Sequence, residues 1–283
     1  MQCHIIPTGR VWMEAGGVFG LVPRPLWIEK QPLDSCNRIP MDLNSLLIQS
    51  EGKNILVDTG MGNKLSEKRR KQWNLEWPEG NLIQNLLKLD ISPEDIDIVI
   101  NSHLHSDHCG GNTIRVNGEI IPTFPKAEYW VQRIEFADAM RPNARTKSTY
   151  LQENFNPLWK QNRLNLLHGD TNVTSEIQCR VTPGHTTGHQ CIVLTNPDSH
   201  PVVFVADMAT FAIHMEQTAW VAAYDVTPLE SINTKIFWQD WAIKNKALLI
   251  FQHDTITRKG TLHRNSEGQL DIKTAEPGSF GIN

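Results

Sequence analysis

The feature that most constrains this chain is a dense group of metal-binding residue types directly after a predicted strand. The apolar run Asp97-Ile-Val-Ile100 leads into Asn-Ser-His-Leu-His-Ser-Asp-His. The run predicts a buried strand that ends in a loop, and ligands at the end of a strand lie on a rigid base. His103 and His105 are two residues apart, so in extended backbone both imidazoles point to one side and can hold one ion. Asp107 and His108 must then turn toward a second ion.

Three further candidate ligands each follow a signal for a strand or a tight turn. His185 follows Val-Thr-Pro-Gly, Asp207 follows Val-Val-Phe-Val-Ala, and His253 follows Leu-Leu-Ile-Phe-Gln. A single histidine is more often a surface or core residue than a ligand, but seven such residues at strand ends together indicate a metal site at a sheet edge. Other histidines are interpreted as surface or hydrogen-bonded core residues: His4, His168, His189, His200 and His263.

The order His-x-His-x-Asp-His, followed by a single His, Asp and His, resembles the metallo-β-lactamase superfamily over nearly the whole chain. The stretch Asn54-Ile-Leu-Val-Asp-Thr-Gly60 is similar to the family's early strand and turn, whose aspartate, here Asp58, supports a ligand histidine. The resemblance implies an α/β fold, a four-layer αββα sandwich with two mixed β-sheets flanked by helices, in one domain over residues 1–283. It also implies two divalent ions, with zinc expected first and iron, manganese or cobalt as alternatives. The implied ligands are His103, His105 and His185 for one ion, Asp107, His108 and His253 for the other, and Asp207 as the bridge.

The chemistry that such a site would perform is hydrolysis. Two cations a few ångströms apart lower the pKa of a bridging water toward about 7, which supplies hydroxide as a nucleophile at neutral pH. The carbonyl or phosphoryl oxygen of the substrate would lie on one ion, which takes up the developing negative charge. Asp107 is the candidate to receive the attacking proton and pass it to the leaving group. No serine or cysteine nucleophile is then needed.

Residue identities favour one branch of the superfamily. Flavodiiron oxidases have a glutamate where His105 stands, true β-lactamases generally lack an aspartate at the position of Asp207, and no nucleic-acid-binding arm or glutathione-binding tail is recognisable. Residues 16–27, 58–63 and 220–226 resemble the N-acyl homoserine lactonases and the methyl parathion hydrolase type of phosphotriesterase. We therefore expect a lactone as substrate and a phosphotriester as the second candidate. The non-hydrolytic alternatives are a mononuclear iron oxygenase acting on sulfur compounds and a binder without turnover.

Two parts of the chain bear on substrate contacts. Many of these lactonases place a tyrosine three residues after the bridging aspartate, where it contacts the substrate carbonyl, and here that position is Thr210. Either His214 or Tyr224 takes over this contact, or the substrate differs. Large apolar groups, among them Trp12 and Phe19, also crowd residues 12–27, a stretch predicted as a loop. Such a loop covers a pocket or packs on a partner subunit in a homodimer, with ordinary core packing as the alternative.

Composition is that of a globular enzyme acting on a small-molecule substrate. The chain has 283 residues, is 40% apolar and has a net charge of −4. Lysine and arginine runs are too short to follow a phosphate backbone, so we expect no nucleic-acid partner, and residues 68–71 are predicted as the solvated face of a helix. Five scattered cysteines do not suggest a disulfide framework, and Cys109 is interpreted as a packing residue. No segment suggests a signal peptide or a membrane span, so the expected location is the cytoplasm.

Periodicity predicts alternating helices and strands, as a layered α/β sandwich requires. The predicted helices cover residues 64–73, 81–89, 133–140, 150–161 and 228–244. The predicted strands cover residues 45–49, 54–58, 128–131, 191–195, 202–206 and 247–251. In the last helix, Ile232, Ile236 and Ile243 are the expected core-facing residues.

Overall fold

Two mixed sheets form the centre of the molecule, in a computed structural model that describes residues 1–275 and 280–281. Within these residues each sheet has seven strands. The first sheet runs in the order β16 (Phe280–Gly281), β1 (Gln2–Glu14), β2 (Arg38–Ser50), β3 (Lys53–Val57), β4 (Ile98–Ile100), β7 (Glu128–Gln132) and β8 (Leu164–Leu167). The second runs in the order β15 (Leu270–Thr274), β14 (Lys259–Arg264), β13 (Leu248–Ile250), β12 (Val202–Phe204), β11 (Gln190–Leu194), β10 (Ile177–Val181) and β9 (Thr171–Asn172).

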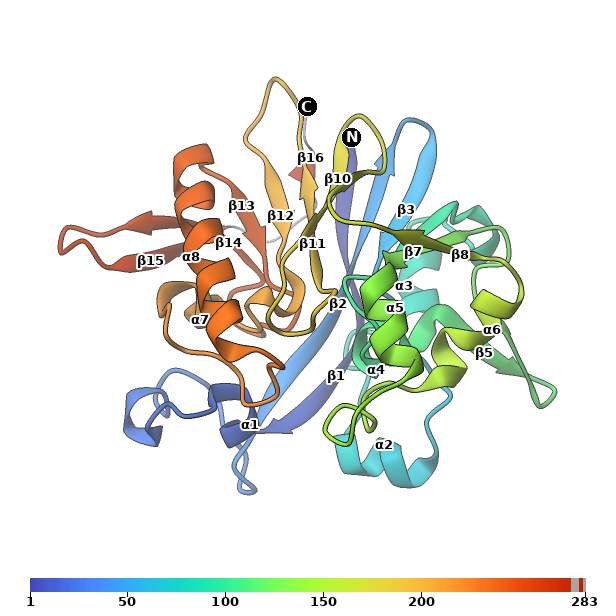
Figure 1. The fold of residues 1–283 in the computed structure, drawn as a ribbon, viewed down its shortest axis with the longest axis horizontal. Helices are drawn as coiled ribbons and strands as arrows, with labels where there is room; N and C mark the ends of the chain where they lie inside the picture. The colour runs from blue at the N-terminus through green and yellow to red at the C-terminus, as the bar shows by residue number, and fades with distance from the viewer. Residues whose placement is uncertain (276–279, 282–283) are drawn as a thin grey trace.

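Helices flank the two sheets on their outer sides (Figure 1). The α-helices are α1 (Ala15–Phe19), α2 (Glu67–Trp73), α3 (Leu82–Leu87), α4 (Ser106–Cys109), α5 (Arg133–Met140), α6 (Asn156–Lys160), α7 (Ala212–Glu216) and α8 (Pro228–Asn245). A separate hairpin consists of β5 (Thr113–Val116) and β6 (Glu119–Pro122). The predicted four-layer αββα sandwich is confirmed.

Parallel pairing at the centre of each sheet brings distant segments to one edge. In the first sheet β3 pairs in parallel with β4, and Val57 lies opposite Ile100. In the second sheet β12 pairs in parallel with β13, and Phe204 lies opposite Ile250. Because paired parallel strands end at the same edge, the residues that follow these four positions emerge side by side. Four of the stretches with predicted site residues follow these strand ends.

Apolar side chains fill the space between the sheets. Leu46 and Ile55 of the first sheet and Ile192 and Phe204 of the second belong to one buried cluster. Full burial of such a side chain contributes roughly 1.5–3 kcal/mol, so this layer supplies much of the driving force for folding. Outer clusters bury the apolar faces of α3 and α8 against the two sheets. The ligand-bearing edge is therefore attached to a rigid base.

Most predicted elements are confirmed, and the differences have physical causes. The helix predicted at 133–140 matches α5, and the helix predicted at 228–244 matches α8 to within one residue. The single helix predicted at 150–161 is wrong, because a 3-10 turn (Gln152–Asn154) and α6 replace it. Pro157 lies in the first turn of α6, where its missing N–H does no harm, whereas a longer helix would have placed it in the interior.

The buried face of α8 also differs from the expectation. Ile243 packs against the cluster on this face as predicted, but Ile236 is 46% exposed, and the fully packed apolar residues are Trp238 and Ala242. Two polar residues also lie on the buried face of α8. Both donate to backbone carbonyls of α7, Lys235 to that of His214 and Gln239 to that of Met215. Helical periodicity of apolar residues missed this face, because the hydrogen bonds of its polar residues make their burial favourable.

The predicted loop at residues 12–27 is wrong for residues 12–19 and confirmed for residues 20–27, which form turns and a short 3-10 segment (Arg24–Leu26). Strand β1 continues to Glu14, and α1 follows directly. Trp12 lies on β1, and its indole donates to Glu76 at 3.1 Å. Phe19 is fully buried and stacks on Trp27 with ring centroids 4.5 Å apart. For Phe19 the structure therefore favours core packing over direct contact with a substrate.

Other expectations concern charge, cysteines and membranes. Residues 68–71 lie exposed on α2, as predicted. All five cysteines are free, and Cys109 is buried, with its thiol donating to the Leu104 carbonyl at 3.2 Å. Across residues 1–275 and 280–281, none of the helices has the length and apolar character needed to cross a membrane.

Candidate metal centre

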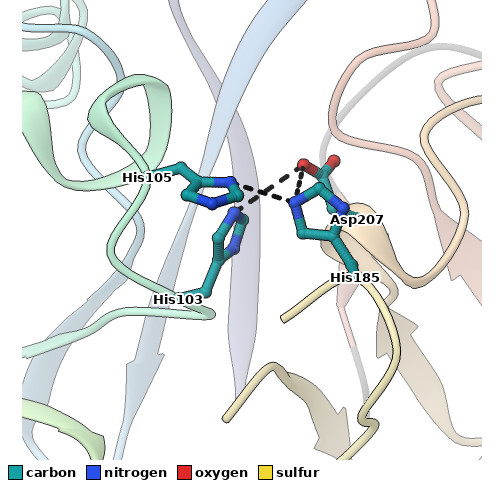
Figure 2. Close-up of side chains that lie close together, drawn as sticks. All are labelled: His103, His105, His185 and Asp207. Atoms are coloured by element: carbon teal, nitrogen blue, oxygen red, sulfur yellow. Dashed lines mark hydrogen bonds and ion pairs between the residues drawn. The ribbon is translucent and has the colours of Figure 1, made fainter. Parts of the chain in front are cut away.

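The seven predicted ligands converge at one edge of the sandwich. Their candidate ligand atoms form two clusters, each with all its atoms within 4.8 Å of one another, and most of these side chains are buried. The first ligand group consists of His103, His105 and His185, and the second ligand group consists of Asp107, His108 and His253. Figure 2 shows how the first group surrounds Asp207, whose carboxylate points toward the imidazoles.

Asp207 lies between the two ligand groups. Its Oδ2 is 3.1 Å from Nε2 of His185 and 3.8 Å from Nε2 of His103. The other oxygen, Oδ1, is 3.0 Å from Nε2 of His253, which belongs to the second group. The same Oδ2 also approaches Nε2 of His108 at 3.2 Å. One oxygen of this carboxylate is thus near both groups and the other is near the second group, a placement that suits a bridge.

Outer partners orient three of the imidazoles. Nδ1 of His108 is 3.0 Å from the carboxylate of Asp58, as the family resemblance implied. Nδ1 of His185 is 3.0 Å from the carboxylate of Asp225, and Nδ1 of His253 is 2.8 Å from the backbone carbonyl of Asp42. Acceptors of this kind place the proton on Nδ1, so each Nε2 presents its lone pair to the cluster.

A cation fits the arrangement that results. Nε2 of His108 and Nε2 of His253 are 3.3 Å apart. With both protons on Nδ1, the two lone pairs repel each other unless a positive charge lies between them. Buried Nε2 atoms of His103 and His105 have no hydrogen-bond partner, and neither has Oδ1 of Asp207. Imidazole nitrogen and carboxylate oxygen together suit zinc and similar divalent ions.

Protonation states also suit ligands. Burial lowers the pKa of His103 and His105 well below the usual histidine value, and neighbouring imidazoles lower both further. Burial acts to raise the pKa of Asp207, but the imidazoles of His253, His108 and His185 outweigh it and hold that pKa well below its usual range. His103 and His105 therefore offer neutral imidazoles, and Asp207 an ionised carboxylate, at neutral pH. Burial acts to lower the pKa of His185, but the carboxylates of Asp207 and Asp225 outweigh it and raise that pKa.

The backbone is strained at two of these positions. Asp58, which follows β3, has φ 57°, and Ala206, which precedes Asp207, has φ 46°. Left-handed backbone at a residue other than glycine costs about 1–3 kcal/mol and persists where the surroundings enforce it. Here each bend follows a central strand and directs a carboxylate into the cluster.

The sequence interpretation missed two side chains that support the ligands. Asp225 lies in the stretch 220–226 that resembled the lactonases, and an acid within an apolar stretch was the available signal. His189 is a hydrogen-bonded core residue, as predicted, but its Nε2 also accepts the backbone N–H of Asp207 at 3.1 Å. Its Nδ1 lies 2.7 Å from the Thr182 hydroxyl. His189 thus connects the residue after β10 to the backbone of Asp207.

The substrate candidates lie close to Asp207. His214, Thr210 and Asp207 line a cavity of ≈ 10 Å³, about the room that one water molecule needs. Nδ1 of His214 accepts the Phe211 N–H at 3.2 Å, and its buried Nε2 has no partner. The buried hydroxyl of Tyr224 also makes no hydrogen bond, and its ring lies 5.7 Å from that of His185. These two groups remain available to a ligand.

Comparison with known proteins agrees with this geometry. The metallo-beta-lactamase superfamily pattern matches residues 39–225. An N-acyl homoserine lactonase from a Bacillus species is 30% identical over 277 residues, which cover 92% of this chain and 95% of that protein. A probable metal-dependent hydrolase from Staphylococcus aureus superposes with a TM-score of 0.86 at 29% identity and covers 97% of both chains. AidC, a dizinc quorum-quenching lactonase with a bound product, has the same fold, with a TM-score of 0.80 at 20% identity over 98% of this chain and 95% of its own.

The two packed sheets and the buried histidines at their edge define a metallohydrolase. The chain belongs to the metallo-β-lactamase superfamily, and within it this protein is a metal-dependent hydrolase.

Proposed function

We propose that the protein is a binuclear metal-dependent lactonase that opens the ring of N-acyl homoserine lactones. The observation that supports this most is Asp207, whose carboxylate lies 3.1 Å from His185 of the first group and 3.0 Å and 3.2 Å from His253 and His108 of the second. A single ion would leave one of these groups without a partner. The choice of a lactone rests on the lactonase relative, which matches this chain along nearly its whole length.

Each residue then has a defined task in ring opening. When bound, divalent cations polarise a carbonyl oxygen and lower the pKa of water to about 7. Asp107 is 15% exposed, and one of its oxygens lies 3.6 Å from Nε2 of His108. We assign to its carboxylate the proton that leaves the attacking water. As the ring C–O bond breaks, Asp107 passes this proton to the leaving oxygen, which gives a hydroxyl group and a carboxylate.

Tyr224 is our candidate for the contact that Thr210 is too short to make. Its hydroxyl is buried without a hydrogen bond, near the ring of His185. A phenol donates one hydrogen bond, which suits a carbonyl oxygen that gains negative charge. Tyr224→Phe should therefore lower kcat about 100- to 1,000-fold, the usual cost of a lost oxyanion donor, with little change in metal content.

A metal and substrate panel tests the proposal. Purified protein should contain two divalent ions per chain and should hydrolyse N-hexanoyl homoserine lactone, as followed by proton release. Aryl esters and phosphotriesters should react more slowly. His263→Ala is the matched histidine control, because His263 is exposed and pairs only with Asp271, away from the cluster.

Two outcomes would overturn the proposal. One iron per chain with oxygen uptake would favour the oxygenase alternative. Full occupancy by two ions without lactone turnover, but with phosphotriester turnover, would move the substrate to the second candidate.

A further inference from the structure

Glu135 is a buried carboxylate that the proposed chemistry does not use. It lies in the first turn of α5 and has no exposed surface. An ionised side chain is rarely buried unless hydrogen bonds compensate for the lost hydration. The hydrogen-bond donors around Glu135 therefore indicate the role of this buried side chain.

Three donors from three separate segments meet at this carboxylate. The backbone N–H of Leu104 donates to Oε1 at 2.9 Å, and the hydroxyl of Tyr150 donates to the same oxygen at 2.9 Å. The hydroxyl of Thr186 donates to Oε2 at 2.6 Å. Both carboxylate oxygens are thus engaged by segments that are distant in the chain.

Each of these donors is next to a ligand of the first group. Leu104 lies between His103 and His105, and Thr186 directly follows His185. The Tyr150 ring lies against the His105 ring, with centroids 5.0 Å apart. One carboxylate therefore connects both of the turns that present the first ligand group.

Gly188 allows the turn after β10 to lie directly against Glu135. A Cβ atom at Gly188 would lie 2.5 Å from the backbone nitrogen and the Cβ of Glu135. Any larger residue at 188 would push the turn after β10 away from α5. The close contact between this turn and Glu135 thus depends on glycine.

From this geometry we infer that Glu135 is a positioning residue for the first ligand group, which holds His105 and His185 at the spacing that one divalent ion requires. It contacts no ligand side chain and acts through Leu104, Thr186 and Tyr150. The inference rests on the proposed metal site and is independent of the choice of lactone as substrate.

Zinc titration under buffered free metal tests this inference. The parent protein should bind two ions per chain in resolvable steps. Glu135→Leu removes all three hydrogen bonds and should weaken one step about 10- to 100-fold, the usual cost of losing an outer partner of a metal ligand. The other step should not move. Glu135→Gln should restore most of the affinity, because its amide oxygen still accepts two donors and the Thr186 hydroxyl can accept from its amide nitrogen.

A second pair of variants shows which of the two zinc-binding steps depends on Glu135. His253→Ala should leave one ion, bound by the first group, and Glu135→Leu in that background should weaken this remaining ion. The visible spectrum of bound Co²⁺ should change with it. Glu216→Leu is the matched control, because this half-buried carboxylate accepts a backbone N–H from Ile272 of β15, the edge strand of the second sheet. It should lower stability without changing either step.

Smaller substitutions keep the test decisive if Glu135→Leu does not fold. Thr186→Val and Tyr150→Phe each remove one donor, and each should weaken the same step by less. Unchanged zinc affinity in both of these variants, or in a folded Glu135→Leu protein, would overturn the inference. Loss of zinc affinity without any lactone turnover in the parent would contradict the proposed substrate and leave the role of Glu135 intact.

Discussion

Side chains from elsewhere in the fold fix the first ligand group, whereas the second is fixed largely by backbone. Asp225 orients His185, and the partners of Glu135 flank the ligands of the first group. In the second group, His253 donates from Nδ1 to the Asp42 carbonyl and accepts the Asp42 N–H at its own carbonyl. The carbonyl of His108 accepts the Thr59 N–H at 2.7 Å. Two side chains also contribute, because Asp58 accepts from Nδ1 of His108 and the Thr59 hydroxyl donates to the His108 carbonyl at 3.2 Å.

This difference follows from where the ligands lie. His253 follows β13 and contacts β2 directly, so neighbouring strands place it. The first group lies on turns after β4 and β10, where the His185 carbonyl accepts the Val226 N–H at 3.1 Å. Side-chain hydrogen bonds from distant segments add to such backbone contacts here. Single substitutions outside the ligands should therefore disturb the first ion more than the second.

The largest effect should come from Asp207→Ala, which removes the carboxylate that the two ligand groups share. Activity should fall by more than the roughly 10- to 100-fold that loss of an outer partner costs, and at least one ion should be lost. The core strands should remain folded, because the interior between the sheets is unchanged. Metal analysis, circular dichroism and turnover measured on one preparation check this. Near-normal turnover with two ions bound would show that Asp207 is not the bridge.

Asp225→Ala should act on the first group alone. His185 loses the acceptor of its Nδ1 proton, so its ring is free to rotate and to change tautomer. We expect about 10- to 100-fold weaker binding of one zinc ion and no change for the other. Buffered zinc titration measures both steps, and Asp225→Asn, which keeps an acceptor oxygen, should lie between Ala and the parent. Equal weakening of both zinc-binding steps would contradict the proposed difference between the two ligand groups.

Asp42→Ala provides the corresponding test of the second group. Its carboxylate pairs with Arg10 at 2.6 Å and with Arg258 at 2.8 Å, whereas its hydrogen bonds with His253 are made by its backbone carbonyl and N–H. The variant should lose roughly 1–3 kcal/mol of unfolding free energy, as hydrogen bonds to charged groups disappear. Zinc affinity should stay within about twofold of the parent, since the carbonyl remains. A large drop in affinity for folded protein would mean that side chains fix the second group as well.

Lys235→Met should leave both groups intact and change only how stability depends on pH. Burial lowers the pKa of Lys235 to about 8 from an ordinary value of 10.5. Between these values the unfolded chain binds a proton that the folded chain has lost, so the unfolding free energy of the parent should rise with pH. The rise amounts to about 3 kcal/mol at most. Urea unfolding at pH 7 and pH 10 should show a smaller rise in the variant than in the parent, because Lys64, whose pKa burial also lowers to about 8, contributes to both.

The candidate ligands could be predicted from the sequence because most of them lie close together in the chain or directly after a predicted strand. Four of the seven lie within six residues, and the others each follow a strand or a tight turn. The strands leading to them are short apolar runs, and these runs also fix the layered fold. Local pattern and global architecture agree at these positions.

The supporting residues could not be found in this way, since they act across long separations. Glu135 is 31 residues from Leu104 and 51 from Thr186. Nothing near Glu135 in the sequence distinguishes it from an exposed helical acid. The same limit explains α8, where Lys235 and Gln239 are buried because partners on α7 accept their hydrogen bonds.

The central claim is that two ligand groups share Asp207 around two ions. Anomalous diffraction from zinc-loaded crystals, measured above and below the zinc edge, tests it most directly. We predict two peaks, one within bonding distance of His103, His105 and His185 and the other of Asp107, His108 and His253, with a different Asp207 oxygen on each. A single peak at full zinc loading, or two peaks without Asp207 between them, would contradict this account.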